Sequence, residues 1–342
     1  MRRSAVWRIG AGMLVLLLLA ACSRAPAPSG APGPAGQAPQ QPAWSPQRPI
    51  EFVVTTNPGG GSDLYARFMA QIVEKYKLSP QPLVVVNKPG GAGAVGMQYL
   101  HSKRGDPHAV LITLNSVFTT PYLQKLPFSS IADDFTPVAL VALDPFVLWV
   151  NRQSRWQTFQ DFIAEARQRS ITVGGTGSRQ EDEILFNLLQ RAAGTQPFKY
   201  TPFEGGGAVA AALAGGHIEA TVNQPSEAAP HYPDRVRPLV VFQEQRNPLY
   251  PDVPTIKEAG LDRPELIYYQ VRGIVAAPGI ELAAQKWLTD LFKKIYDTQD
   301  WQDYLKQNLM VGRFLGGDEF KKFLQDYVKL HADLIRALNW AQ

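Results

Sequence analysis

The stretch PIEFVVTTNPGGGSDLYAR, residues 49–67, decides the fold. Its apolar, β-branched run 50–56 predicts a strand, and the cluster NPGGG that follows predicts a turn. Ser62 and Asp63 then begin a helix predicted over 64–75. A helix that starts directly after glycines exposes backbone N–H groups at the positive end of its dipole. The stretch therefore predicts a socket for a carboxylate or phosphate, and the alternative is a plain surface turn at the end of a strand.

A second glycine-serine helix start occurs later in the chain. Residues 171–175, ITVGG, predict a short strand, and a helix is predicted from Arg179 to Gly194. Between them, Ser178 and Glu181 have the spacing of a capping box. Two such helix starts predict two lobes that hold one ligand between them, and binding of this kind needs no catalytic group.

The N-terminus predicts export. Arg2, Arg3 and Arg8 precede an apolar core over 9–21 that is too short to remain as a membrane-spanning helix. The sequence LAAC that ends at Cys22 has the form of a bacterial lipobox, which predicts a signal peptide over 1–21 and lipid on Cys22. The alternative is an ordinary signal peptide with a chance cysteine. We expect an extracytoplasmic protein anchored by lipid to the cell membrane, in a periplasm or on an outer cell face.

Composition narrows the classes of function further. Cys22 is the only cysteine, so the folded part has no disulfide, cysteine-ligated zinc or cysteine nucleophile. The whole chain has 34 Lys and Arg against 30 Asp and Glu, and loss of the three leader arginines leaves 31 against 30. This balance gives no reason to expect a nucleic-acid surface. Residues 22–47 are rich in Pro, Ala and Gly and predict a flexible tether.

The remaining residues alternate between strand and helix patterns and predict an α/β fold with two Rossmann-like lobes. The first lobe is expected to comprise 48–143 and 272–342, and the second to comprise 144–271. The apolar segments 134–150 and 268–276 are expected to cross between the lobes. Two crossings of this kind act as a hinge beside a central cleft.

Two local patterns add detail to this organisation. The sequence predicts amphipathic helices over 281–308, with a break near Thr298, and over 317–338. In PDVPTIKEAGL, residues 251–261, Thr255 and Glu258 have the spacing of a capping box.

Six motifs in order resemble the substrate-binding proteins of tripartite tricarboxylate transporters, also called Bug receptors. The resemblance covers nearly all of 44–342 and rests on the opening stretch and on VVVNKPGGAGAVG (84–96), DFTPVALVA (134–142), GGTGS (174–178), YTPFEGGG (200–207) and PDVPTIKEAGL (251–261). It implies a two-lobed, type II-like periplasmic-binding-protein fold, a carboxylate ligand and no cofactor. It also implies delivery to a permease with one large and one small membrane subunit. We expect the protein to be a monomer.

The resemblance also implies a set of ligand-binding positions. They are Gly59, Gly60, Gly61, Ser62, Asp63, Thr176, Gly177, Ser178, Arg179, Phe203, Gly205 and Asn223. Asp63 is expected to cap the helix rather than touch an anion, and Asn223 is either a cleft contact or a turn residue. Gly60→Val and Ser178→Ala are predicted to weaken binding without unfolding the protein.

The sequence departs from the family pattern at acidic positions. Glu204 stands where relatives usually have lysine, and Glu181 stands where many have histidine, with Asp182 and Glu183 directly after it. Acids in the first turn of a helix stabilise its dipole, which is the simpler interpretation. If they face the cleft, they disfavour a dicarboxylate and favour an amino acid or another zwitterion, with Arg179 as a carboxylate partner.

Three other functions can be compared with the sequence. Gly91, Gly93 and Gly96 form a G-x-G-x-x-G after a predicted strand, as in a dinucleotide-binding oxidoreductase, but the next strand ends Thr113-Leu114-Asn115 without the expected acid. No nucleophile elbow or metal-binding histidine pair supports a hydrolase. A lipoprotein that senses a ligand for a membrane sensor remains an alternative, because the same cleft would serve it.

Overall fold

Two mixed β-sheets form the framework of the computed structural model, which describes residues 44–248 and 250–340. The six-stranded sheet has the order β11-β4-β10-β3-β1-β2, with β1 Ile50–Val54, β2 Leu83–Asn87, β3 Ala109–Ile112, β4 Thr136–Pro145, β10 Tyr269–Ala276 and β11 Val311–Gly316. The five-stranded sheet has the order β7-β6-β8-β5-β9, with β5 Val147–Asn151, β6 Thr172–Thr176, β7 Lys199–Phe203, β8 Ala220–Asn223 and β9 Val236–Val241. We call these sheets and the helices packed on them the first and the second lobe.

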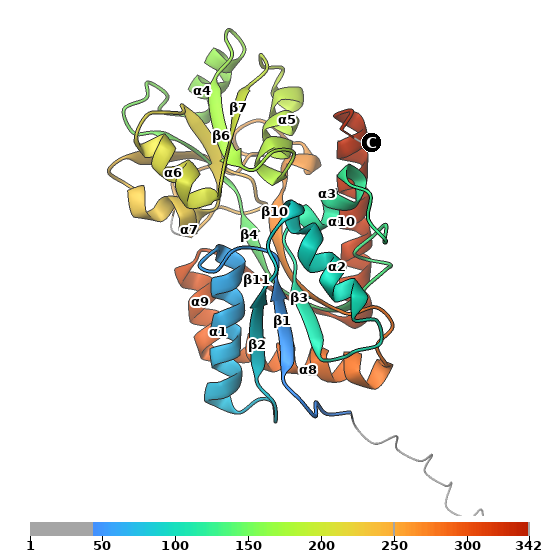
Figure 1. The fold of residues 1–342 in the computed structure, drawn as a ribbon. Helices are drawn as coiled ribbons and strands as arrows, with labels where there is room; N and C mark the ends of the chain where they lie inside the picture. Colours follow the sequence, from blue (N-terminus) through green and yellow to red (C-terminus); the bar gives the residue numbers. More distant parts are fainter. Residues whose placement is uncertain (1–43, 249, 341–342) are drawn as a thin grey trace, which may run out of the picture. The chain divides into compact units, whose positions relative to one another are not determined.

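The helices follow the strands in the alternating order that the sequence predicted (Figure 1). Those of the first lobe are α1 Gly61–Tyr76, η1 Gly91–Gly93, α2 Ala94–Ser102, α3 Ser116–Leu123, α8 Leu282–Asp297, α9 Gln299–Gln307 and α10 Gly317–Ala337. Those of the second lobe are α4 Phe159–Ala166, α5 Glu181–Ala193, α6 Gly206–Ala214, α7 Pro225–Ala228, η2 Ala229–His231 and η3 Pro264–Leu266. The predicted break at Thr298 is confirmed, since this residue ends α8 and its side chain caps α9 by accepting a hydrogen bond from the Trp301 N–H.

Each sheet combines a parallel part with antiparallel strands. Strand β1 pairs in parallel with β2 and β3, and β6 pairs in parallel with β7 and β8, as expected for βαβ units. Strands β4, β5 and β10 run antiparallel to their neighbours. The predicted Rossmann-like pattern therefore holds for three strands in each sheet. It does not extend to the strands through which the chain passes between the lobes.

The two crossings lie side by side. Strands β4 and β10 pair along their length, from Thr136 with Ala276 to Pro145 with Tyr269, and Phe146 alone separates β4 from β5 in the other sheet (Figure 1). The predicted boundary at 143/144 thus falls inside β4. At Gly273 in β10, an added Cβ would lie 2.4 Å from the Phe320 ring, so only glycine lets α10 pack this closely on the sheet.

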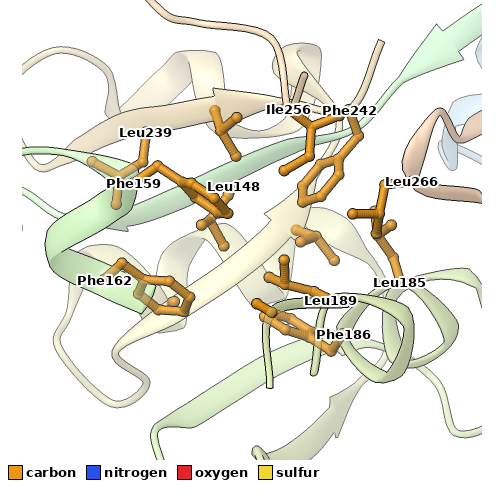
Figure 2. Close-up of a cluster of buried hydrophobic side chains, with 14 of the residues drawn as sticks. Leu148, Phe159, Phe162, Leu185, Phe186, Leu189, Leu239, Phe242, Ile256 and Leu266 are labelled. Carbon is orange, nitrogen blue, oxygen red and sulfur yellow. The ribbon is translucent and has the colours of Figure 1, made fainter. Parts of the chain in front are cut away.

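The second lobe has its own apolar core, in which helices α4 and α5 pack against the sheet. Phe162, Phe186 and Leu148 are all buried there (Figure 2). Leu334, from the last part of α10, belongs to the same core, whereas Phe320 from the start of this helix packs in the first lobe. The prediction placed all of 272–342 in the first lobe, but the end of α10 packs against the second, because its apolar stripe continues past the first sheet.

The folded part of the chain includes residues before the predicted start at residue 48. The Trp44 ring lies 5.2 Å from the Trp287 ring and 5.4 Å from the His108 ring, measured between centroids, so Trp44, which the prediction placed in the tether, packs on the first lobe. The signal peptide over 1–21 and lipidation of Cys22 lie outside the described residues. Within the described residues, no helix is both long and apolar enough to cross a membrane.

Candidate functional site

A cavity of about 1010 Å³ lies between the two lobes. The first lobe lines it with the loop after β1 and the start of α1, with 89–93, and with side chains of β10 and α9. The second lobe lines it with 176–177, 180–182, 203–208 and part of α7. Most of these segments follow the carboxyl ends of parallel strands, where α/β folds place their ligands.

The glycine loop of the first lobe presents an uncapped helix start. Helix α1 begins at Gly61 after the N-cap Gly60, and no described side chain caps it there. The Asp63 carboxylate accepts a hydrogen bond from the Gly59 N–H at 2.8 Å and others from Arg67 and Asn87. Burial raises the pKa of Asp63, but these three donors outweigh it and lower the pKa below its ordinary value. Asp63 therefore fixes the loop instead of capping the helix as predicted, and it leaves the first N–H groups of α1 available to a ligand.

A buried ion pair stands beside this helix start. The Arg272 guanidinium donates to Asp144 Oδ2 at 2.8 Å and to Ser62 Oγ at 3.1 Å. It also lies over the Tyr65 ring, 4.6 Å from the centroid, and the Tyr65 hydroxyl donates to Asp144. The side chains of the pair are only 7% and 1% exposed. An added Cβ on Gly61 would lie 3.8 Å from Arg272 Nη2, so glycine leaves open the space between helix and cation.

The acids of the second lobe face the cleft. Glu181 and Asp182 both line the cavity, and both are buried, at 7% and 2% exposure. Asp182 accepts a hydrogen bond from the Thr176 N–H at 2.5 Å and so shapes the loop after β6. The predicted capping box is wrong: Gln180 is the N-cap of α5, and Ser178 makes no cap bond there, because Arg179 takes a left-handed conformation with φ of 57°.

A third acid, Glu227 on α7, was not predicted. Its carboxylate lies against the start of α6, where a Cβ on Gly206 would fall 2.0 Å from Glu227 Cδ. A larger residue at this position would therefore displace the Glu227 carboxylate. Burial raises the pKa of Glu227 to about 8, and the Asp144 and Glu181 charges add to the rise, while Arg272 and the Gln224 N–H oppose it. Glu227 thus belongs to the same electrostatic cluster as the ion pair of the first lobe.

The other predicted residues separate into two groups. Thr176, Gly177, Phe203 and Gly205 line the cavity together with Gly59, Gly60, Gly61 and Ser62. Ser178 and Arg179 are exposed and lie outside the cavity lining, so Arg179 is not placed as a carboxylate partner. The Asn223 amide donates to the Gly206 carbonyl and accepts from the Gln224 N–H, so it supports the start of α6 and does not line the cavity.

Uncharged donors complete the wall of the first lobe. The hydroxyls of Thr55, Thr56 and Ser116 are buried, line the cavity and have no hydrogen-bond partner among the described residues. Tyr65 and Tyr304 supply aromatic surface, whereas Phe118, Phe146 and Tyr268 lie in the apolar cores. This half of the cavity is rich in groups that donate hydrogen bonds to an anion.

The G-x-G-x-x-G segment contributes to the same cavity. Gly91 and Gly93 line it, in a run where Gly90, Gly91, Ala92 and Gly93 all have positive φ. Gly96 instead packs on the sheet, since a Cβ there would lie 2.7 Å from Thr55 Cγ2. These glycines thus shape a loop of the cleft and allow close packing of α2.

The sequence did not lead us to predict three charged residues at or beside the site, Arg272, Asp144 and Glu227. Arg272 and Asp144 are charged residues within the two apolar crossing segments, and a charge inside a buried strand is uncommon enough to signal a site. Glu227 gave no comparable signal, because QPSEAAP reads as an ordinary polar turn. Its role depends on α7 folding back against the start of α6.

Comparison with known proteins identifies the family. Residues 66–340 match the family described as Tripartite tricarboxylate transporter family receptor, TctC. A Cupriavidus necator protein, "UPF0065 protein in gbd 5'region", is 28% identical over 299 residues, which cover 87% of this chain and 89% of that protein. Protein BugT of Bordetella pertussis is 26% identical over 243 residues, covering 69% of this chain and 72% of BugT.

Solved structures agree with this match. A ligand-free TctC solute binding protein from Polaromonas is 28% identical with a TM-score of 0.70, covering 85% of this chain and 99% of that chain. The periplasmic binding protein BugD shares the fold, with 20% identity and a TM-score of 0.74 over 86% of this chain and 99% of its own. The predicted two-lobed α/β fold is thereby confirmed.

The family is a substrate-binding receptor, so the oxidoreductase interpretation of Gly91, Gly93 and Gly96 is not retained. With four-fifths of its residues inside the match, this chain belongs to the tripartite tricarboxylate transporter receptor family and is a periplasmic solute-binding protein rather than an enzyme.

Proposed function

We propose that this protein captures a small carboxylate-bearing metabolite in the cleft between its lobes and delivers it to the membrane subunits of a tripartite tricarboxylate-type transporter. The observation that carries the proposal is the uncapped start of α1, which faces the cavity beside Arg272. Backbone N–H groups, the helix dipole and a nearby guanidinium together form a site for a carboxylate.

The residues proposed for this site come from both lobes. Gly59, Gly60, Gly61, Ser62 and Arg272 hold the carboxylate in the first lobe. Across the cavity, the ligand contacts Thr176, Gly177, Phe203 and Gly205. A ligand that touches both lobes favours the closed form, because only that form supplies both sets of contacts.

Proteins of the same fold support a carboxylate as ligand. One structure is described as MatC from Rhodopseudomonas palustris with bound malate, and another as R. palustris Rpa4515 with adipate. They are 24% and 22% identical to this chain. Both bound molecules are small carboxylates, the class of ligand that the start of α1 suits.

The anchor is part of the proposal. The lipobox that ends at Cys22 supports lipidation, with residues 22–43 as the link between the membrane and the folded part. Mass spectrometry of the protein from membranes tests this point: a diacylglyceryl group on Cys22 is expected, and a soluble chain cleaved elsewhere would contradict it.

Binding is tested by a thermal-shift screen of the purified protein, followed by calorimetry of each hit. The panel contains di- and tricarboxylates, aromatic acids, acidic and neutral amino acids, and NAD. Saturation by a carboxylate-bearing compound at one site per chain is the expected result. Stabilisation by NAD alone, or by no member of the panel, would overturn the proposed ligand class.

A further inference from the structure

Two carboxylate oxygens in the second-lobe wall of the cleft are buried without partners. Glu181 is 7% exposed and lines the cavity, and its Oε2 atom has no hydrogen-bond partner among the described residues. Glu227 also lines the cavity, and its Oε2 atom is likewise buried without a hydrogen-bond partner among the described residues. A buried polar atom without a partner costs free energy, so native structures rarely keep one unless a ligand or water completes it.

Neighbouring positive charge does not account for the burial of these two carboxylates. Arg272 is the only lysine or arginine among the cavity-lining residues that the structure describes; its two Nη atoms donate to Ser62 and Asp144, and only its Nε has no partner there. Asp182 is a third buried acid, and one of its oxygens accepts a hydrogen bond from the Thr176 N–H. When ionised, the second-lobe wall therefore carries an excess of negative charge.

The groups facing these acids come from several elements and interact with one another. Burial raises the pKa of Glu181 on α5, and its hydrogen bond with Gln270 of β10 lowers that pKa by a smaller amount. Burial, followed by the Glu181 and Glu227 charges, raises the pKa of Asp182 well above its ordinary value. Burial and the charges of Asp144 and Glu181 raise that of Glu227 to about 8. In the absence of a ligand cation, this wall favours bound protons.

The two halves of the cleft thus differ in chemistry. The first-lobe half offers helix N–H groups, the Arg272 guanidinium and the unpartnered hydroxyls of Thr55 and Ser116, all of which suit a carboxylate. The second-lobe half offers acceptors to a donor that carries positive charge. Since a dianion would bring its second carboxylate to Glu181 and Glu227, like-charge repulsion would weaken its binding.

We propose that the ligand carries a protonated amino group as well as a carboxylate, and that this ammonium lies against Glu181 and Glu227 while the carboxylate lies at the start of α1. The inference rests on the proposed receptor function and narrows its ligand to zwitterions of the amino-acid class. An ammonium group supplies three donors, enough to satisfy both open oxygens. Because Glu181 and the α1 loop belong to different lobes, such a ligand links them when the cleft closes.

Calorimetry with matched pairs of probes tests the proposal on the purified protein. Each pair differs by one amino group: butyrate and 4-aminobutyrate, hexanoate and 6-aminohexanoate, glutarate and L-glutamate. In at least one pair, the amino compound is expected to bind tenfold or more tightly than its partner. At neutral pH its binding should also release protons, because an ammonium displaces the proton held by Glu227, and this release appears as a dependence on the ionisation enthalpy of the buffer.

Three variants separate a role in ligand binding from a role in folding. Glu181→Gln and Glu227→Gln should each reduce the preference for the amino compound at least tenfold while leaving the affinity for the plain carboxylate equal or higher. Glu183→Gln is the matched control, since Glu183 accepts a hydrogen bond from the Arg179 N–H and does not line the cavity. This control should keep the full preference and the proton release.

The failures of the two proposals are distinguishable. If plain carboxylates bind as tightly as their amino partners, or if both glutamine variants keep the wild-type preference, the ammonium proposal is overturned and the carboxylate receptor stands. If no probe and no member of the wider panel binds, both proposals fall.

Discussion

Replacing Glu227 with glutamine should stabilise the ligand-free protein at alkaline pH. In the folded chain, burial raises the pKa of this carboxyl to about 8 from an ordinary value of 4.5. Glutamine has the same shape, so it keeps the close contact with Gly206 and removes only the ionisable group. The substitution therefore isolates the free energy of ionising this one carboxyl in the cleft.

The sign follows from proton linkage. Below about pH 4.5, Glu227 holds a proton in both the folded and the unfolded chain. As the pH rises to about 8, the unfolded chain loses this proton first, so the free energy of unfolding falls. The full pKa rise corresponds to at most about 5 kcal/mol. Because part of Glu227 reaches solvent, we expect about 1–2 kcal/mol, or about 2–8 °C in the melting temperature.

Urea denaturation of wild type and Glu227→Gln at pH 5 and pH 8.5 measures this effect, with circular dichroism as the signal. The gain in stability from the substitution should be larger at pH 8.5 by the stated amount. Glu181 and Asp182 are also raised in pKa, but they are present in both proteins, so their titration largely cancels in the difference. An equal difference at both pH values would refute the reasoning.

Three further predictions concern the rest of the site. Gly61→Val should lower the affinity for a bound carboxylate on the order of tenfold. The circular dichroism spectrum should not change, since an added Cβ meets only Arg272 at 3.8 Å and Tyr65 at 4.0 Å. Unchanged affinity would argue against an anion site at α1. Ser178→Ala, first predicted to weaken binding, should leave the dissociation constant unchanged, because Ser178 is exposed outside the cavity, and a clear loss would place it in the site after all. Asp144→Asn should lower the free energy of unfolding in urea by about 3 kcal/mol, since it leaves Arg272 buried without its charge partner; a cost below about 1 kcal/mol would mean that solvent reaches the guanidinium.

The glycine loop and helix start that we propose as the carboxylate site could be predicted from local sequence. The glycines at 59–61 follow a strand of buried β-branched residues and precede an amphipathic helix, and each of these patterns acts within a few residues. The same is true of the break at Thr298, where the side chain caps the next helix. Local hydrogen bonding and periodicity determined these features, so the sequence was sufficient for them.

The chemistry across the cleft was decided by the tertiary structure. The sequence left open whether Glu181 and Asp182 face solvent or ligand, because both arrangements place acids in the first turn of a helix. In the folded chain both are buried, Glu181 beside Gln270 of β10, and Glu227 and Arg272 belong to the same electrostatic cluster. Residues from four segments that are far apart in the sequence lie together there, and local sequence patterns carry no information about such long-range contacts. The chain by itself therefore determined the uncapped helix start that we propose as the carboxylate site, whereas long-range packing determined which charges lie across the cleft from it.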